Sequence, residues 1–214
     1  MTEAPLFLND HQRYTLQAAM ERVMPADDDP GATDAGTVIW LDRYLSGTGY
    51  IHAKPDGSGF LNLGPREAAV WLGRIDRLRA VYAAGLSDLD LRSSSQYGHE
   101  FSRLAPGQQD EILRQVEQAE ATPSAAESDA SAQRAAKRAN ENSFDEDTAP
   151  FFQLLVAHTR QAFYSDPVYG GNRDRVGWKT IGFPGPMSLA DTQANRYTTE
   201  AYFADGTDLD VENS

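Results

Sequence analysis

Apolar positions that recur at helical spacing divide the chain into several predicted helices. The first is predicted to run from an N-cap at Asn9 or Asp10 to Met24, because Asn and Asp cap helices well and Pro25 cannot continue one. Its apolar face is a loose stripe made of Tyr14, Ala18, Met20 and Val23.

A turn-rich acidic connector, DDDPGATDAG, leads to a second predicted helix. Thr33 or Asp34 is expected to cap this helix, and Ser46-Gly47 is expected to end it. Its apolar positions are Val38, Trp40, Leu41, Tyr44 and Leu45. Residues 47–63 are rich in glycine and predict a loop or a short hairpin around Pro55-Asp56-Gly57.

The best-defined amphipathic helix opens at Pro65, since a proline in the first turn sacrifices no helical hydrogen bond. Its apolar stripe consists of Ala68, Trp71, Leu72, Ile75, Leu78 and Tyr82. Phe101 and Leu104 predict a short packed turn after it. Pro106 is expected to start a further helix that carries Ile112, Leu113 and Val116.

Residues 121–147 are small and polar, with almost no large apolar side chain, and predict a flexible insert. Thr148 and Pro150 then begin the last predicted helix, FFQLLVAHTRQAFY, which is apolar around most of its circumference. Such a helix is expected to lie at the centre of the fold. Residues 190–214 predict a polar, acidic tail.

These segments together predict an all-α fold: a single domain over residues 1–214, built as an irregular bundle of five or six helices. A long ordered loop is expected between His158 and Gly185, where the composition favours neither helix nor strand. This run holds five Gly, two Pro, two Tyr, two Phe and one Trp. Because fixing each residue costs about 1–2 kcal/mol, an ordered loop of this kind is typical of a segment that covers a partner or walls a site.

The charge and composition narrow the classes of function. The formal net charge of −13 disfavours a nucleic-acid partner. The chain has no cysteine, which excludes disulfides, thiolate metal sites, iron–sulfur clusters and a Cys nucleophile. No signal peptide and no membrane span is recognisable, so no membrane insertion is expected. The sequence as it stands predicts a cytoplasmic chain, or an exported one if its partner carries the signal.

The sequence shows no credible catalytic constellation and no metal site. The four histidines are scattered, and His158, on the last predicted helix, is best interpreted as a structural residue. The acidic clusters at residues 27–29 and 205–212 lack the residue order of a calcium loop, and the tripeptides GTG and GSG lack the strand–helix context of a phosphate loop.

The run from residue 158 to 185 admits two interpretations. Its turn positions are Asp166, Pro167, Gly170, Gly171 and Asn172, with Gly182, Pro184 and Gly185 at the exit. Its large aromatic residues are Tyr164, Tyr169, Trp178 and Phe183, and its basic residues are Arg173, Arg175 and Lys179. Packed on its own fold, the run is a compact surface loop, whereas facing outward it has the composition of an interface hot spot.

The same run resembles the signature of the gluconate 2-dehydrogenase subunit 3 family. That signature is an Asp-Pro-x-Tyr-Gly-Gly-Asn turn, then Gly-Trp, then Phe-Pro-Gly, which here are residues 166–172, Gly177-Trp178 and 183–185. The N-terminal half is similar too, with a helix ending at Met24-Pro25 and then Pro30-Gly31-Ala32. The resemblance spans most of the chain apart from the predicted insert and tail.

The resemblance implies a non-catalytic small subunit of an enzyme complex. Members of the family pair with a large FAD-dependent oxidoreductase of the glucose–methanol–choline type, which oxidises a sugar, a sugar acid or a glycoside. In some systems a multihaem cytochrome c completes the complex. FAD is therefore expected in the partner, and no cofactor is expected in this chain. Several members carry a twin-arginine signal, but none precedes Leu6 here.

The resemblance assigns the motif run to partner binding. Tyr164, Tyr169, Trp178 and Phe183 are expected at or directly under the interface, and Asp166, Gly170, Gly171 and Asn172 are expected to set the shape of the loop. The full predicted set adds Pro167, Arg173, Gly177, Lys179, Pro184 and Gly185. Two alternatives are a standalone helical adaptor or export chaperone, and an enzyme that uses Tyr169, Asp166 or His158 on a sugar.

Overall fold

The computed structural model describes residues 6–56, 58–121, 145–183, 185 and 194. Within these ranges it contains six α-helices, four short 3₁₀ turns and no strand, so the predicted all-α fold is confirmed. Most of the predicted insert at 121–147 and of the predicted tail at 190–214 lies outside the described residues.

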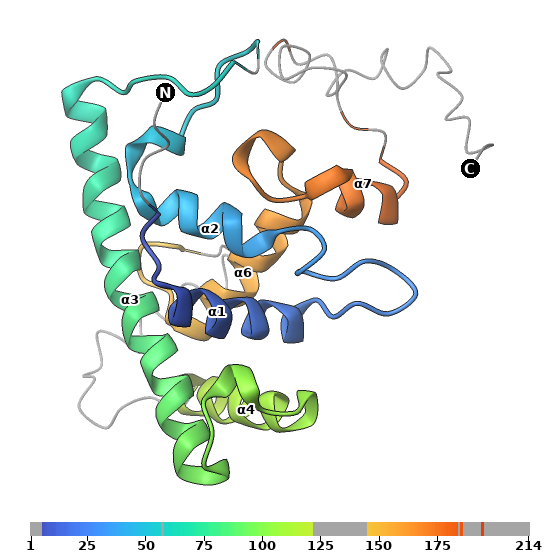
Figure 1. Ribbon diagram of the computed structural model, residues 1–214. Helices are drawn as coiled ribbons and strands as arrows, with labels where there is room; N and C mark the ends of the chain where they lie inside the picture. The colour runs from blue at the N-terminus through green and yellow to red at the C-terminus, as the bar shows by residue number, and fades with distance from the viewer. Residues whose placement is uncertain (1–5, 57, 122–144, 184, 186–193, 195–214) are drawn as a thin grey trace.

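A single long helix forms the frame of the molecule. Helix α3 (Pro65–Tyr97) has 33 residues and runs along one side, while three shorter helices cross it (Figure 1). These are α1 (Asp10–Val23), α2 (Thr37–Ser46) and α6 (Phe151–Tyr164). Helix α4 (Pro106–Ala121) packs near the C-terminal end of α3, after the 3₁₀ turn η2 (Phe101–Arg103).

Helix α1 begins as the sequence predicts but buries a different face. The Asn9 side chain accepts a hydrogen bond from the Gln12 N–H, and the Gln12 side chain accepts one from the Asn9 N–H, which completes a capping box. Tyr14, however, is 65% exposed. The core side of α1 is formed instead by Thr15, Leu16, Ala19 and Met20, because Leu16, Ala19 and Met20 follow the helical spacing more closely.

The cap predicted for α2 is wrong. Gly36, in the left-handed conformation with φ of 70°, precedes the helix, and Thr33 and Asp34 lie in a turn before it. That turn is closed by the Ala35 and Gly36 N–H groups, so the chain reverses before the helix can begin. Residues 52–61 then form a small hairpin, with one antiparallel bridge between Ala53 and Phe60, which agrees with the second of the two sequence predictions.

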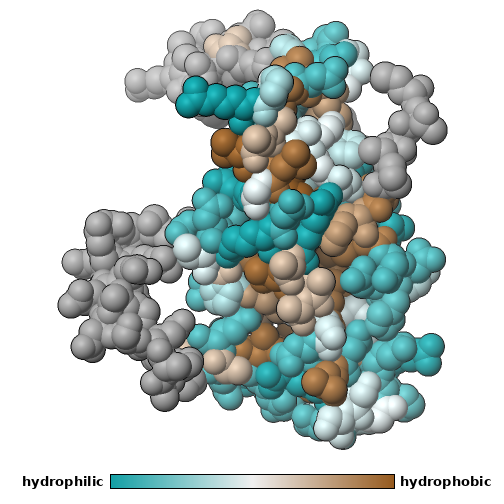
Figure 2. All heavy atoms as spheres, turned by 90° about the vertical axis from the view of Figure 1, so that its left-hand side faces the viewer, coloured by the Kyte–Doolittle hydropathy of each residue, from teal (hydrophilic) through white to brown (hydrophobic). Residues whose placement is uncertain are grey.

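Helix α3 starts at Pro65 as predicted, with Gly64 as its N-cap. Its apolar stripe is buried from Ile75 onward, whereas Leu72 is 41% exposed, contrary to the pattern. The surface on the α3 side carries hydrophobic residues in separate patches among hydrophilic ones (Figure 2). No helix in the described ranges combines the length and the apolar character needed to cross a membrane.

Helix α6 is central, as its all-round apolar character predicts. Seven of its residues are buried, among them Leu154, Leu155 and Phe163. One hydrophobic core joins α6 to residues of α1, α2, α3, η2 and α4. Phe151 at the start of α6 fits against α3 because Gly85 leaves room for its ring. Helix α6 thereby holds the bundle together and places its own C-terminal end beside α2.

A buried carboxylate fixes the entry of the chain to the bundle. Asp42 of α2, which has no exposed surface, accepts hydrogen bonds from the N–H groups of Phe7 and Leu8 at 2.8 and 2.9 Å. The guanidinium group of Arg13 also donates to it at 2.9 Å. Four N–H groups, from Phe7, Leu8 and Arg13, thus converge on one anion, which the interior stabilises only in their presence.

We expect Asp42→Ala to lower the free energy of unfolding by about 3 kcal/mol, because it leaves buried donors without an acceptor. Asp88→Ala is the matched control: it breaks the partly exposed pair between Asp88 and Arg92 on one helix, and should cost less than about 1 kcal/mol. Urea denaturation followed by circular dichroism measures both. Equal losses for the two variants would contradict the role given to Asp42.

Candidate functional site

The motif run after α6 contains short helical elements, which corrects the prediction of a loop without regular structure. It holds η3 (Pro167–Tyr169), η4 (Arg173–Arg175) and the helix α7 (Val176–Thr180). The Asp166 carboxylate accepts the Val168 N–H at 2.9 Å and so caps η3. Helix α6 is therefore not the last helix, since α7 follows it. The turns of this segment form because each is stabilised by its own side chains.

The run is tied together from inside by buried side chains. Asn172 has no exposed surface and bridges two parts of the run. Its side chain donates to the Ser165 carbonyl and accepts the Gly177 N–H, both at 2.9 Å. The Trp178 indole N–H donates to the Tyr164 carbonyl at 2.8 Å, and Trp178 is only 6% exposed. The rings of Phe183 and Trp178 pack edge to face, with centroids 5.3 Å apart.

Several glycines of the motif are required by close packing. A side chain on Gly177 would collide with the Phe163 carbonyl, and one on Gly171 with the Ala162 carbonyl. Gly185 lies directly against the Trp178 ring. Pro184 lies outside the described residues. The spacing of these glycines therefore reflects how tightly the run packs on the end of α6.

The backbone of the run is strained at three non-glycine residues. Asn172, Asp174 and Arg175 have φ values of 46°, 56° and 59°. The left-handed conformation costs such residues roughly 1–2 kcal/mol each. The hydrogen bonds of Asn172 offset part of this strain. The local shape of the run is thus maintained by contacts rather than by backbone preference.

Arg173 fastens the run to the turn that precedes α2. Its backbone N–H donates to the Ala35 carbonyl at 3.0 Å, and its guanidinium donates to the carbonyls of Thr33 and Asp34. Arg173, one of the three basic residues of the run, therefore makes its contacts within the fold. Arg175 lies 6.0 Å from the Trp178 ring centroid, and Lys179 is exposed.

Tyr169 and Gly170 attach the other end of the run to α2 and to the small hairpin. The Tyr169 hydroxyl accepts the Ala53 N–H at 3.3 Å, and its ring lies 5.8 Å from that of Phe60. Gly170 has φ of 100°, and a Cβ atom there would lie 3.0 Å from the Arg43 guanidinium. The motif run thus positions Arg43 as well as its own residues.

An aromatic cleft of about 550 Å³ opens where the run meets the bundle. Six of its lining residues are aromatic and come from α2, η1 (Thr48–Tyr50), α3, α6 and η3. The lining consists of Trp40, Arg43, Tyr44, Tyr50, Ile51, Trp71, Glu146, Gln161, Tyr164, Ser165, Asp166 and Tyr169. A cleft of this size and character is typical of a binding site.

The structure divides the predicted site residues into two groups. Tyr164, Asp166 and Tyr169 line the aromatic cleft, whereas Trp178 and Phe183 pack against each other within the run. Sequence reasoning did not assign the remaining lining residues to a site. A signal for two of them was present, since Trp40 and Tyr44 stand one helical turn apart on α2, but that spacing is also what a core stripe produces.

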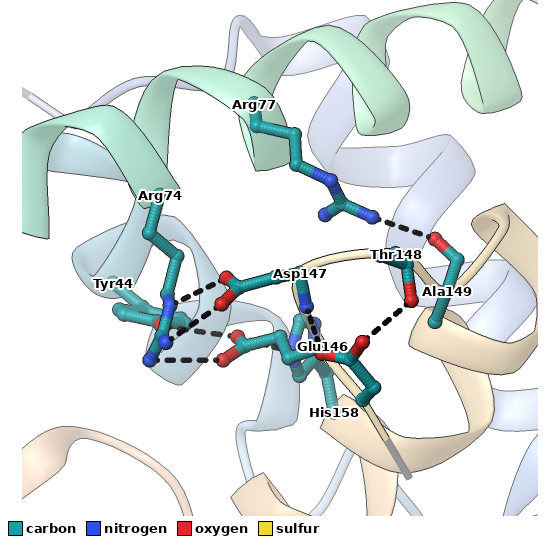
Figure 3. A network of polar contacts seen from close by, with 9 residues as sticks. Tyr44, Arg74, Arg77, Glu146, Asp147, Thr148, Ala149 and His158 are labelled. Carbon is teal, nitrogen blue, oxygen red and sulfur yellow. Dashed lines mark hydrogen bonds and ion pairs between the residues drawn. The ribbon is translucent and has the colours of Figure 1, made fainter. Parts of the chain in front are cut away.

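A network of polar contacts lies beneath the aromatic cleft (Figure 3). The Glu146 carboxylate accepts hydrogen bonds from the Tyr44 hydroxyl and the His158 Nε2, both at 3.0 Å. Arg74 of α3 lies 3.6 Å from its other oxygen and forms two hydrogen bonds with Asp147. Residues 145–147 are therefore held in a defined turn, which corrects the predicted extent of the flexible insert.

The proton positions in the network follow from its geometry. Burial raises the pKa of Tyr82, so its hydroxyl remains protonated, and its oxygen lies 2.8 Å from His158 Nδ1. The other ring nitrogen, Nε2, faces the Glu146 carboxylate at 3.0 Å and donates a hydrogen bond to it. His158 has no exposed surface, and both of its ring nitrogens are bonded. It is thus the structural histidine that the sequence predicts.

The charge state of Glu146 is set by opposing effects. Burial raises the pKa of its carboxyl group, but the hydrogen bonds from His158 and Tyr44, together with the charge of Arg74, bring that pKa below its ordinary value of 4.5. Burial and the neighbouring Glu146 charge raise the pKa of the Tyr44 hydroxyl. At neutral pH the Glu146 side chain is therefore a carboxylate, and the Tyr44 hydroxyl is protonated.

The fold and the cleft define an all-helical protein that carries an aromatic cleft beside the motif run. The chain belongs to the gluconate 2-dehydrogenase subunit 3 family, whose sequence model matches residues 10–185. The match includes every described helix and the motif run to Gly185. Members of this family are accessory subunits of a dehydrogenase complex. No curated protein and no solved structure matches the chain.

Among the described residues no group of three His, Asp or Glu side chains is placed to hold a metal ion.

We expect Gly170→Ala to lower the free energy of unfolding by about 2 kcal/mol, because φ of 100° strains any other residue and the new methyl group crowds Arg43. Gly73→Ala is the matched control. It lies inside α3 with open space around it, and the same substitution should stabilise the protein by about 0.5–1 kcal/mol. Thermal unfolding measures the change in stability of both variants. Changes of the same sign in the two variants would contradict this account.

The Glu146 network predicts a pH-dependent contribution to stability. The pKa of Glu146 is lower in the folded protein than in the unfolded chain. Its contribution to stability is therefore complete above about pH 4.5 and is lost as the pH falls through the folded-state pKa. Glu146→Gln should therefore cost about 1–3 kcal/mol at neutral pH, and the stabilities of variant and wild type should converge in acid.

Denaturant midpoints measured across the acid range test this expectation. Glu117→Gln, on the exposed face of α4, removes a carboxylate far from the network and controls for the change in net charge. Curves for wild type and Glu146→Gln that stay parallel into acid would show that Glu146 has no such role.

Proposed function

We propose that this chain is the non-catalytic small subunit of a dehydrogenase complex, and that it binds and stabilises a large FAD-dependent oxidoreductase of the glucose–methanol–choline type. The observation that carries the proposal is the family membership over residues 10–185. In this proposal the FAD belongs to the partner, which oxidises a sugar, a sugar acid or a glycoside. A cytochrome c subunit is a further partner that the family resemblance suggests.

The three side chains that an enzyme would use, those of His158, Asp166 and Tyr169, already make hydrogen bonds within the fold, which supports a binding role. His158 is buried, with both nitrogens bonded to Tyr82 and Glu146. The Asp166 carboxylate caps η3, and the Tyr169 hydroxyl accepts the Ala53 N–H. A general base must reach the proton that it abstracts, and His158 has no exposed surface from which to do so. These side chains are employed in shaping the fold.

The binding surface in this proposal consists of the aromatic cleft and the outer side of the motif run. Tyr164 is 38% exposed and lies at the cleft, and Ile181, just after α7, is 58% exposed. Exposed aromatic and aliphatic side chains on an ordered segment are typical of interface anchors. Trp178 is 6% exposed and its indole N–H donates to the Tyr164 carbonyl, so in this proposal it supports the surface from beneath.

Co-expression with the proteins encoded beside it on the chromosome tests the proposal. A tagged chain is expected to retain a yellow, stoichiometric complex whose flavin is bleached by a sugar or a sugar acid. A complex that persists through gel filtration indicates a permanent subunit, whereas one that dissociates after folding indicates an adaptor or export chaperone. A folded, colourless chain that retains no oxidoreductase would overturn the proposal.

Two exposed aliphatic residues provide a matched pair for locating the interface. We expect Ile181→Asp to weaken the complex by at least about tenfold, because it places a charge in an apolar contact. Leu91→Asp introduces the same charge at a residue of α3 that is 69% exposed, and should leave the affinity unchanged. Surface plasmon resonance measures both, and a larger effect at Leu91 would move the interface to the α3 face.

A further inference from the structure

The aromatic cleft already holds positively charged groups against its rings. The Arg43 guanidinium carbon lies 5.5 Å from the Tyr50 ring centroid, and that of Arg74 lies 5.2 Å from the Trp71 ring centroid. Both distances are within the range of cation–π attraction. Two rings of the cleft, one on η1 and one on α3, thus each lie at a distance from a guanidinium group at which cation–π attraction acts.

The charged side chains of the cleft favour a cation. Two carboxylates, Glu146 and Asp166, and one guanidinium, Arg43, are found among the described residues that line it. The lining therefore carries a formal charge of −1, in a chain whose formal net charge is −13. Arg74, which lies over the Trp71 ring, is not a lining residue, and it is paired with Asp147 at 2.8 Å. A negative, aromatic cleft attracts a positive group both through its carboxylates and through the ring faces.

The two carboxylates differ in how far they are already engaged. Glu146 accepts hydrogen bonds from Tyr44 and His158 and lies near Arg74. In the described part of the chain, one hydrogen bond reaches the half-buried Asp166 carboxylate, from the Val168 N–H to Oδ1. Since a carboxylate accepts about four hydrogen bonds, Asp166 keeps capacity for an incoming donor and Glu146 keeps much less.

We propose that the aromatic cleft receives an arginine side chain of the bound protein, stacked on the aromatic rings and paired with Asp166. The inference rests on the proposed function, because it assigns that arginine to the partner oxidoreductase. A guanidinium group fits this combination better than an ammonium group, because it is planar, stacks on aromatic faces and bonds a carboxylate through two N–H groups. Arginine is also a frequent interface hot spot.

The tryptophans of the chain provide a direct test on the chain alone. The three indole N–H groups give three signals in a ¹⁵N–¹H spectrum. Trp40 and Trp71 line the cleft, and Trp178, whose N–H is bonded to the Tyr164 carbonyl, serves as an internal reference. The probe is N-acetyl-arginine N-methylamide, and the matched control is the same compound made from citrulline, which is equally planar but neutral.

We expect the arginine probe to shift the Trp40 and Trp71 signals in a saturable manner and to leave Trp178 as the least affected. The citrulline probe should bind about tenfold more weakly, the value of one hydrogen bond to a charged group. Equal affinity for the two probes, or the absence of a saturable shift, would overturn the inference.

Asp166→Asn isolates the charge of the carboxylate. Asparagine retains the oxygen that caps η3, so the variant should unfold at nearly the wild-type denaturant midpoint. It should nevertheless lose about tenfold in affinity for the arginine probe, and a folded variant that binds the probe as tightly as wild type would contradict the pairing. Tyr14→Phe, at an exposed position of α1, controls for differences between protein preparations and should bind the probe as wild type does.

The complex with the oxidoreductase separates this inference from the proposed function. If the wild-type complex forms and Asp166→Asn weakens it about tenfold, both stand. If the complex forms and Asp166→Asn leaves its affinity unchanged, the arginine assignment is wrong and the accessory role remains. If no oxidoreductase binds the wild-type chain, the proposed function fails and the assignment of the arginine to that partner fails with it.

Discussion

The arrangement of the molecule depends on one partly buried carboxylate, that of Glu146. It joins Tyr44 of α2 and His158 of α6 through hydrogen bonds of 3.0 Å, and it lies 3.6 Å from Arg74 of α3. Its ionised form is stable there only because several donors surround it. An apolar core alone allows helices to shift against each other, whereas a satisfied polar network fixes their register. We therefore attribute the defined shape of the aromatic cleft to this network.

The motif run completes the cleft from the other side. Asn172 and Trp178 bind it to its own backbone, and Arg173 fastens it to the turn before α2. The strain at Asp174 and Arg175 is tolerated because these contacts hold the run in place. A surface of this kind is formed before a partner arrives, so binding loses less conformational entropy than it would with a flexible loop. This is the physical basis on which we interpret the run as a supporting frame and the cleft beside it as the contact.

The sequence predicted those parts of the fold that depend on local signals. The capping box that begins at Asn9, the proline at the start of α3 and the all-round apolar character of α6 each mark an element directly. The start of α2 was mispredicted, because the turn before it is held by Arg173, which is distant in sequence. The cleft combines residues 40–51, 71, 146 and 161–169. Residue 146 lay in a segment whose composition indicates a flexible insert, so no local pattern marked it as a member of the site.

Hydrogen–deuterium exchange of the chain, free and bound to the oxidoreductase, tests the central claim most directly. The account predicts that binding slows exchange at residues 39–51 and 161–183, which form the cleft and the motif run, and leaves α4 unchanged. Because the run is already ordered in the free chain, the added protection should be largest around its most exposed residues, such as Ile181. Protection confined to α4 and the C-terminal half of α3 would contradict the account, since the partner would then bind a different face.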